Sequence, residues 1–368
     1  MDIWSSVTYR NSIKRSLDMI DTQPLQGKSI LITGASGLIG SAIVDLLICS
    51  NLILNTNLTI YAAGRSVNKI SERFAHGLDY GIIPVEYDAT KDISFDFAVD
   101  YIIHGASNAS PDKYVTEPVD TMLANILGVS NLLKYAKKCG ARKTVYISSS
   151  EVYGIITHGK PLREDEYGKV DILGNRASYP MGKRAAESIC ISYANQYGLD
   201  VSIVRPGHIY GPTAQKSDKR ISSDFAYRAA AGESLVMKSA GTQIRSYCHC
   251  IDCATAILAV LLKGKCKEAY NISNPDSVIT IRQMAEIIAD CAGVELIMDL
   301  PSNADKIAFN PMNNSSLDSK KLEQLGWSGM RNPRQGFSEV IQILKEVNAY
   351  AFNVIRKNRS ELLKDSGN

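Results

Sequence analysis

The stretch ITGASGLIGSAIVDLL, residues 32–47, decides the fold of this chain. An apolar strand pattern runs into Gly34, Gly37 and Gly40, and a helix pattern follows. The first two glycines allow a tight turn and a close approach to a pyrophosphate, and the third lets the helix pack closely on the strand. Free N–H groups and the helix dipole then favour an anion at that point. The cofactor-binding residues predicted here are Gly34, Ser36, Gly37, Leu38, Ile39 and Gly40.

Strand and helix patterns alternate beyond this stretch. Strand patterns cover residues 28–34, 58–64, 82–88, 99–107, 143–150 and 200–206, and helix patterns cover 38–50, 121–140 and 179–198. Such alternation implies right-handed crossovers and a parallel sheet with helices on both faces. We therefore predict an α/β fold, a Rossmann-type doubly wound parallel sheet with a smaller, discontinuous α/β substrate lobe.

The chain divides into four predicted parts. Residues 1–27 form an N-terminal extension, in which Ile13, Leu17 and Ile20 have the spacing of a short docked helix. The Rossmann domain covers 28–205, and 246–271 returns to it. The irregular segments 206–245 and 272–345 form the substrate lobe, and 346–368 form a C-terminal helix or tail.

Composition excludes several classes of protein. The net charge is only +3, and the Lys and Arg residues are dispersed, so no nucleic-acid partner is expected. The N-terminus lacks an apolar signal-peptide core, and no apolar run reaches membrane-spanning length. We therefore expect a cytoplasmic protein with no membrane segment.

Eight cysteines without a secretory signal are interpreted as reduced core residues. Cys248, His249, Cys250 and Cys253 could together suggest a metal site. However, their spacing matches no common zinc pattern, and a second C-x-x-C is absent. They also lead directly into an apolar helix pattern, so buried thiols and no metal are predicted.

The tip of the second strand bears on the choice of dinucleotide. Arg65 stands there instead of an acid, so it could accept the 2′-phosphate of NADP or stack on adenine. Asp88, after the third strand, is placed to meet the adenine edge. Further cofactor-binding residues are predicted at Ala89, Gly105, Ala106, Ser107 and Asn125.

A catalytic group is predicted at the fifth strand and the helix that follows it. The strand ends at Ser149 and Glu151, on the edge where such sheets bind ligands. Tyr179 and Lys183 are four residues apart, on one helix face. The ammonium of Lys183 and an oxidised nicotinamide would stabilise the phenolate of Tyr179, which could then act as a general base while Ser149 binds the reacting oxygen. These residues predict hydride transfer to a bound nicotinamide, and Tyr179 and Lys183 also count as cofactor-binding.

Longer motifs identify the chain as a member of the extended short-chain dehydrogenase/reductases that act on nucleotide sugars. The resemblance runs from Lys28 to about Leu344 and includes GASGLIG, SSEVYG, YPMGK, RPGHIYGP, RSYCHCIDCA and LDSKKLEQLGW. Within the family it is closest to the UDP-glucuronate decarboxylases. ASNASPDKY is similar to their A-S-P-A-S-P-x-x-Y, and RASYPMGKRAAE to their R-A-C-Y-D-E-G-K-R-V-A-E.

This resemblance implies a redox-neutral reaction. C4 of the sugar is oxidised, the β-keto acid loses CO2, and the same NADH reduces the ketone again. Such a closed cycle favours tightly held NAD, with NADP kept open by Arg65. Ser149 and Tyr179 are assigned to hydrogen transfer, Lys183 to their support, and Glu151 to chemistry at the sugar ring. The implied substrate-binding residues are Ser110, Tyr114, Ser150, His208, Arg220 and Arg245.

Family members also pair through the two long helices, which implies a homodimer with a four-helix bundle.

Two other functions stay open: a 4-epimerase or 4,6-dehydratase, and a dinucleotide-binding protein without catalysis. Ser150 stands where a dehydratase of the family has Asp, which disfavours elimination of water. His208 replaces a frequent Asn and is either a substrate donor or a loop residue. Glu151 could alternatively be a solvated loop acid.

Overall fold

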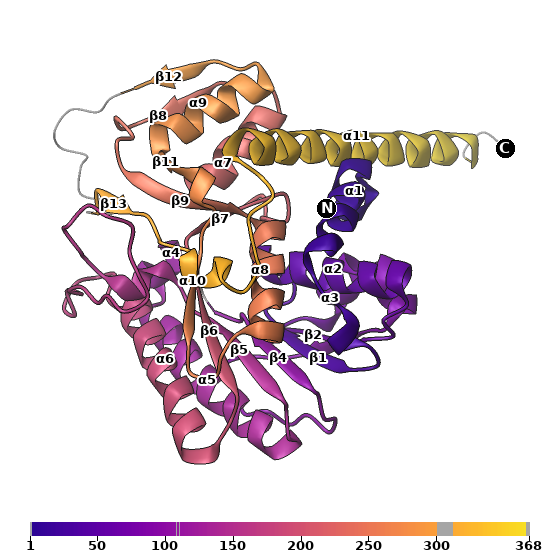
Figure 1. Cartoon of the computed structure of the whole chain (residues 1–368). Helices are drawn as coiled ribbons and strands as arrows, with labels where there is room; N and C mark the ends of the chain where they lie inside the picture. Colours follow the sequence, from indigo (N-terminus) through magenta and orange to yellow (C-terminus); the bar gives the residue numbers. More distant parts are fainter. Residues whose placement is uncertain (1, 108, 110, 300–311, 366–368) are drawn as a thin grey trace.

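A seven-stranded parallel sheet forms the centre of the molecule (Figure 1). The computed structural model describes residues 2–107, 109, 111–299 and 312–365, and only the backbone of 111–113 and 352–365. In sheet order the strands are β10 (Ala269–Ile272), β6 (Val201–Pro206), β5 (Lys143–Ile147), β4 (Tyr101–His104), β1 (Ser29–Thr33), β2 (Thr59–Gly64) and β3 (Ile82–Glu86). All six predicted strands are therefore confirmed.

Helices cover both faces of this sheet. The side chains of β1 alternate between two apolar cores, because successive residues of a strand point to opposite faces. Ile30 and Ile32 pack in the core that contains α2 (Leu38–Leu54) and α8 (Cys250–Lys263), with α3 (Val67–Arg73) at its edge. Leu31 packs on the opposite face with Leu132 of α5 (Pro118–Cys139), and α6 (Ser178–Tyr197) lies beside α5. The predicted doubly wound Rossmann-type fold is confirmed.

A second lobe lies above the carboxyl ends of the strands (Figure 1). Its main sheet joins β11, β9 and β13, and β7 pairs with β9 in parallel. The elements of the lobe are β7 (His208–Tyr210), α7 (Ile221–Ala230), β8 (Leu235–Met237), β9 (Ile244–His249), β11 (Val278–Thr280), α9 (Ile281–Ala292), β12 (Leu296–Met298), β13 (Asn314–Ser315) and α11 (Pro333–Asp365). The short helix α10 (Lys320–Glu323) instead lies against β10, and its Leu322 is buried in the core of the large domain.

Two predicted boundaries are wrong. The boundary at residue 246 cuts β9, which pairs over its length with strands of the lobe; the return to the large domain starts with α8, at Cys250. The boundary at residue 346 cuts α11, which is continuous because no Gly or Pro interrupts it after Gly336. The thiols of Cys248, Cys250 and Cys253 are buried in the apolar core, as predicted.

The N-terminal extension contains the predicted docked helix. It is α1 (Val7–Ser16), which lies between α2 and α11 (Figure 1). Ile13 is fully buried, but Leu17 lies beyond the helix in a 3-10 turn. The hydroxyl of Tyr9 donates to the carboxylate of Asp45 on α2 at 2.6 Å. At the other side, Glu346 of α11 accepts bonds from the Ser6 and Thr8 side chains and the Thr8 N–H, so it caps α1 from another element.

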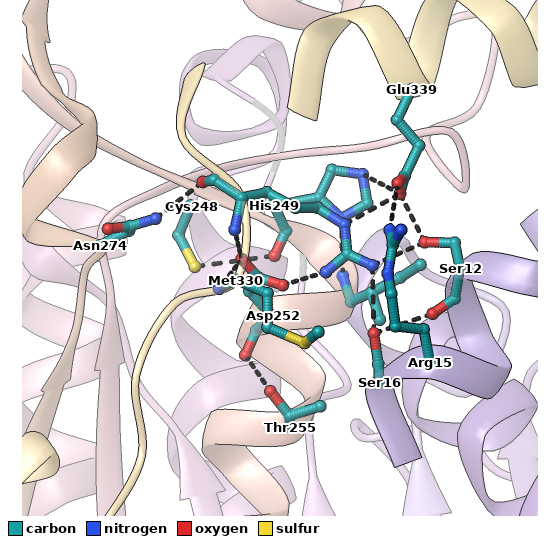
Figure 2. Close-up of polar contacts among 12 residues, drawn as sticks. Ser12, Arg15, Ser16, Cys248, His249, Asp252, Thr255, Asn274, Met330 and Glu339 are labelled. Atoms are coloured by element: carbon teal, nitrogen blue, oxygen red, sulfur yellow. Dashed lines mark hydrogen bonds and ion pairs between the residues drawn. The ribbon is translucent and has the colours of Figure 1, made fainter. Parts of the chain in front are cut away.

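A buried ion-pair network joins α1 to both domains. Ser12 and Ser16 of α1, Asp252 of α8 and Glu339 of α11 converge on one point (Figure 2). The guanidinium of Arg331 binds all four: it pairs with Asp252 and Glu339 and donates to Ser12 and Ser16 at 2.6 and 3.1 Å. Arg331 and Asp252 are almost inaccessible to solvent. The extension is therefore an integral part of the packed structure.

Candidate active site

A cavity of about 550 Å³ opens at the carboxyl ends of β1, β2 and β4. Such an edge is where open α/β sheets bind their ligands. The predicted cofactor residues that line it are Gly34, Ser36, Gly37, Arg65, Asp88, Ala89, Gly105, Ala106 and Ser107. The other predicted ones, which lie outside its lining, are Leu38, Ile39, Gly40, Asn125, Tyr179 and Lys183. The sequence did not single out Tyr87, Thr90, Glu117, Asp120, Leu123, Ala124, Leu127 and Gln215, which also line it.

The glycine turn has the geometry that the sequence predicts. Gly34 has a φ of +72°, and a Cβ there would meet the backbone of Gly105 and Ala106 at 2.9 Å. A Cβ on Gly40 would lie only 2.2 Å from the carbonyl oxygen of Gly34, which explains the third glycine. Gly37 caps α2, so the first turn of α2, including Leu38 and Ile39, points its N–H groups towards this turn. The residues present fit a bound dinucleotide pyrophosphate.

The charged side chains that line the cavity are mostly acidic. Asp88 accepts bonds from the Thr90 N–H at 2.9 Å and its hydroxyl at 2.8 Å, and these bonds lower the pKa of Asp88. Glu117 and Asp120 also line the cavity, whereas Arg65 contributes a positive charge from an exposed position. An additional phosphate would meet more negative than positive charge here, which favours NAD over NADP.

Ser149, Tyr179 and Lys183 come together next to this cavity. Tyr179 and Lys183 lie on one face of α6, and both are buried. Burial raises the pKa of Tyr179 to about 12, against the opposing effect of a hydrogen bond with Ser149. Burial also lowers the pKa of Lys183 to about 7, and its ammonium donates to the Ile147 carbonyl at 2.8 Å. The predicted trio is therefore assembled.

Glu151 and Tyr114 face the same trio. The ring of Tyr114 stacks on that of Tyr179, with centroids 4.3 Å apart and an angle of 10°. Glu151 lies in the 3-10 turn Ser150–Tyr153, where Ser149 accepts a bond from its N–H at 3.2 Å. Its carboxylate raises the pKa of both phenols. Glu151 is partly exposed, but its charge acts on the Tyr179 phenol, which argues against a purely solvated acid.

The predicted substrate residues lie around this group, with one exception. Arg220 pairs with Asp218, and its charge lowers the pKa of Tyr179. Arg245 donates to the carbonyls of Ile244 and Met312 at 2.8 and 3.0 Å. Burial, with the charges of Arg245 and Arg220, lowers the pKa of His208 to about 3. Ser150 begins the 3-10 turn and is half-buried, and Ser110 lies outside the described residues.

The structure adds two arginines that sequence reasoning missed. Arg176 lies 4.0 Å from the Glu151 carboxylate, and its guanidinium is 6.0 Å from the centre of the Tyr114 ring. Arg184 donates to the carbonyls of Val152 at 2.7 Å and Gly168 at 2.8 Å, which holds the turn that carries Glu151. Both arginines stand in the quoted motif RASYPMGKRAAE, so their proximity to Tyr179 and Lys183 was the available signal.

Among the described residues, no group of three or more His, Cys, Asp and Glu side chains could hold a metal ion. No described helix is long and apolar enough to cross a membrane.

The chain is similar to several known proteins. Residues 30–273 match the model of the NAD dependent epimerase/dehydratase family. UDP-glucuronic acid decarboxylase 3 of Arabidopsis thaliana is 32% identical over 309 residues, covering 83% of this chain and 86% of the relative. UDP-glucuronic acid decarboxylase 1 of Danio rerio is 31% identical over 316 residues, covering 86% and 72%.

Solved structures show the same fold at lower identity. A dTDP-glucose 4,6-dehydratase of Streptomyces venezuelae with NAD bound has a TM-score of 0.74 and 22% identity, covering 88% of this chain and 98% of that one. A UDP-glucose 4-epimerase of Thermotoga maritima with UDP-glucose has a TM-score of 0.71 and 23% identity, covering 87% and 99%.

Proposed function

The chain belongs to the NAD dependent epimerase/dehydratase family, and we propose that within it the protein is a decarboxylase of UDP-glucuronate. The observation that carries the proposal is the assembly of Ser149, Tyr179 and Lys183 beside the dinucleotide cavity, with the Glu151 carboxylate facing the phenol. The decarboxylases at about 30% identity and the closely similar motifs support this choice.

Each residue of the trio has a defined task in this reaction. Bound NAD would accept a hydride from C4 of the sugar and return it once CO2 has left. Tyr179 takes the proton of the C4 hydroxyl, and Ser149 donates a hydrogen bond to the reacting oxygen. Lys183 lowers the cost of the phenolate by its positive charge. As the bond to the carboxyl carbon breaks, its electron pair moves onto the C4 oxygen as an enolate, which the hydrogen bonds of Ser149 and Tyr179 stabilise.

The remaining charges fit an anionic sugar on a diphosphate. We assign Arg220 and Arg245 to the diphosphate or the sugar carboxylate, since both charges reach the group around Tyr179 and His208. Arg176 approaches Glu151 and adds a third positive charge at the same place. Glu151 is assigned to proton movement at the ring carbon that carries the carboxylate. Contacts with the sugar are assigned to Tyr114, Ser110, Ser150 and His208. Of these, His208 stands where family members often have Asn.

The reaction is tested directly with the purified protein. Incubation with UDP-glucuronate and NAD should release CO2 and yield a UDP-pentose. Inversion at C4 of UDP-glucose without CO2 would instead show a 4-epimerase, and a 4-keto-6-deoxy product a dehydratase. NAD binding with no conversion of any nucleotide sugar would point to a protein without catalysis.

The role of Glu151 has a separate test. Glu151→Gln should leave NAD affinity unchanged and slow turnover by about 10²-fold or more, because the amide cannot carry a proton. Glu286→Gln is the matched control, since Glu286 is a half-exposed acid that pairs with Arg282 on α9 of the other lobe. Equal turnover in the two variants would remove Glu151 from the mechanism.

A homodimer through α5 and α6 is part of the proposal. The two helices pack against each other, and Ser130 lies 3.4 Å from the hydroxyl of Tyr193. Half-buried residues recur at every fourth position along both helices; they are Met122, Ile126, Met181, Ala185, Ile189 and Tyr193. We expect light scattering to give a dimer, and Ile126→Glu to give a monomer that still binds NAD.

A cytoplasmic location stays a prediction of the sequence, which cell fractionation would test.

A further inference from the structure

The ammonium of Lys183 lies between two aromatic rings. Its nitrogen is 4.8 Å from the centre of the Tyr146 ring and 5.8 Å from that of Tyr179. The bond to the Ile147 carbonyl satisfies one of its three N–H donors. The acid nearest along α6, Glu187, is held in a two-point pair with Arg205, at 3.0 and 2.7 Å. The electron-rich ring faces therefore add to the stabilisation of the buried charge by Glu187.

Tyr146 is itself held firmly in place. It belongs to β5 and is 2% exposed. Its ring stacks against His104 of β4, with centroids 5.8 Å apart and an angle of 28°. Its hydroxyl donates to the side-chain oxygen of Asn125 at 3.5 Å, and that oxygen also accepts from Ser107 of the cofactor cavity at 3.1 Å. Tyr146 thus connects the wall of the cavity to Lys183.

We propose that Tyr146 is a positioning residue for the catalytic lysine: its ring face keeps the Lys183 side chain protonated and directed at Tyr179. The catalytic consequence rests on the proposed function, but the effect on Lys183 does not. An ammonium at this position is what lowers the cost of the Tyr179 phenolate. Tyr146 would contribute to the reaction without touching the sugar.

Several other groups lie near Lys183, and the direction in which each affects the Lys183 pKa follows from its charge or its burial. Glu187 and Cys190, on its own helix, raise its pKa, and burial lowers it. His104, on β4, is kept neutral because burial lowers its pKa to about 3, so it adds no positive charge. Removing the Tyr146 ring takes away an attraction for the cation, so the pKa of Lys183 should fall.

The test measures the ionisation of Lys183 directly. Protein labelled with 13C at the lysine ε-carbons is titrated by NMR, and the Lys183 signal is assigned by its loss in Lys183→Arg. Tyr146→Leu removes the ring and should lower the Lys183 pKa by about 0.4 to 1.5 pH units, from the usual strength of a cation–π contact. Tyr146→Phe keeps the ring and should titrate within about 0.2 units of the native protein on the same scale.

A second series protects the test against misfolding of the Leu variant. Phenylalanine with one, two or three ring fluorines at position 146 keeps nearly the same shape but withdraws electron density from the ring face. The Lys183 pKa should fall stepwise with each fluorine, and the basic limb of the kcat profile should move with it. Coincident titrations across the series and the Leu variant would overturn the proposal. A stepwise fall in a protein that converts no nucleotide sugar would support it while refuting the proposed decarboxylase.

Discussion

Replacing Arg331 with Met tests whether the network at α1 stabilises the fold. Arg331 is 2% exposed and pairs with Asp252, which is 1% exposed, and with Glu339. In Arg331→Met, Asp252 keeps the backbone N–H bonds from residues 330 and 331, both at 3.0 Å, but loses its cation. An unpaired buried charge of this kind costs about 3–5 kcal/mol of unfolding free energy. The Ser12 and Ser16 hydroxyls also lose their donor.

The control is three residues further along the chain. Arg334 pairs with Asp290 at 3.0 Å, but the two side chains are 63% and 65% exposed. Arg334→Met should therefore cost about 0–1 kcal/mol, because solvent screens such a pair. Urea denaturation measures both values. Trypsin cleavage within α1, at Arg10, Lys14 or Arg15, should also become faster in Arg331→Met.

The pH dependence gives the prediction a sign. Burial already raises the pKa of Asp252 above its usual range, and removal of Arg331 should raise it further. The folded variant then binds a proton more readily than its unfolded chain does. The loss of unfolding free energy in Arg331→Met, relative to the native protein, should be greatest at neutral pH. This loss should shrink as the pH falls through the raised pKa of Asp252. Equal losses for Arg331→Met and Arg334→Met at pH 7 would refute the reasoning.

Three further changes have defined outcomes. Gly40→Ala places a Cβ 2.2 Å from the Gly34 carbonyl oxygen, so we expect an overpacking cost of about 1–3 kcal/mol and weaker NAD binding by fluorescence titration. Burial raises the pKa of Glu346, but hydrogen bonds to it lower the value to about 2; Glu346→Gln should remove the loss of stability that the native protein shows in urea as pH falls from 4.5 towards 2. Arg184→Lys cannot reproduce the paired bonds that hold the turn of Glu151, so kcat should fall about tenfold in the CO2 assay with little change in NAD affinity.

Each of these three predictions has a control or a result that would contradict it. Gly182→Ala adds a Cβ whose nearest neighbour is at 3.4 Å in a helix, and it should be neutral or stabilising, so equal effects at residues 40 and 182 would contradict the packing argument. An unchanged acid profile in Glu346→Gln would show that other carboxylates control it. An unchanged kcat in Arg184→Lys would show that the turn of Glu151 holds its place without these bonds.

Local patterns in the chain were sufficient to predict the fold of the large domain. The glycine spacing requires close backbone contacts within a few residues, and the strand and helix periods repeat regardless of what packs on them. Tyr179 and Lys183 share a helix face, so their proximity follows from helix geometry alone. Ser149 could be placed beside them because strands of a parallel sheet present their carboxyl ends at one edge.

Contacts between segments that are distant in the chain could not be predicted from these local patterns. Nothing in the local sequence shows that Tyr114 stacks on Tyr179, or that β9 belongs to the sheet of the lobe. The same holds for Arg331, whose partners Asp252 and Ser12 are about 80 and about 320 residues away in the chain.

The sequence by itself determined the Rossmann-type sheet, its dinucleotide turn and the candidate trio of Ser149, Tyr179 and Lys183, because each depends on short-range geometry. Only the tertiary structure decided how the N-terminal helix joins the two lobes, which arginines face Glu151, and that the Lys183 charge lies between two rings. Those features depend on burial and on charges brought together from separate elements, and neither quantity exists until the chain is packed.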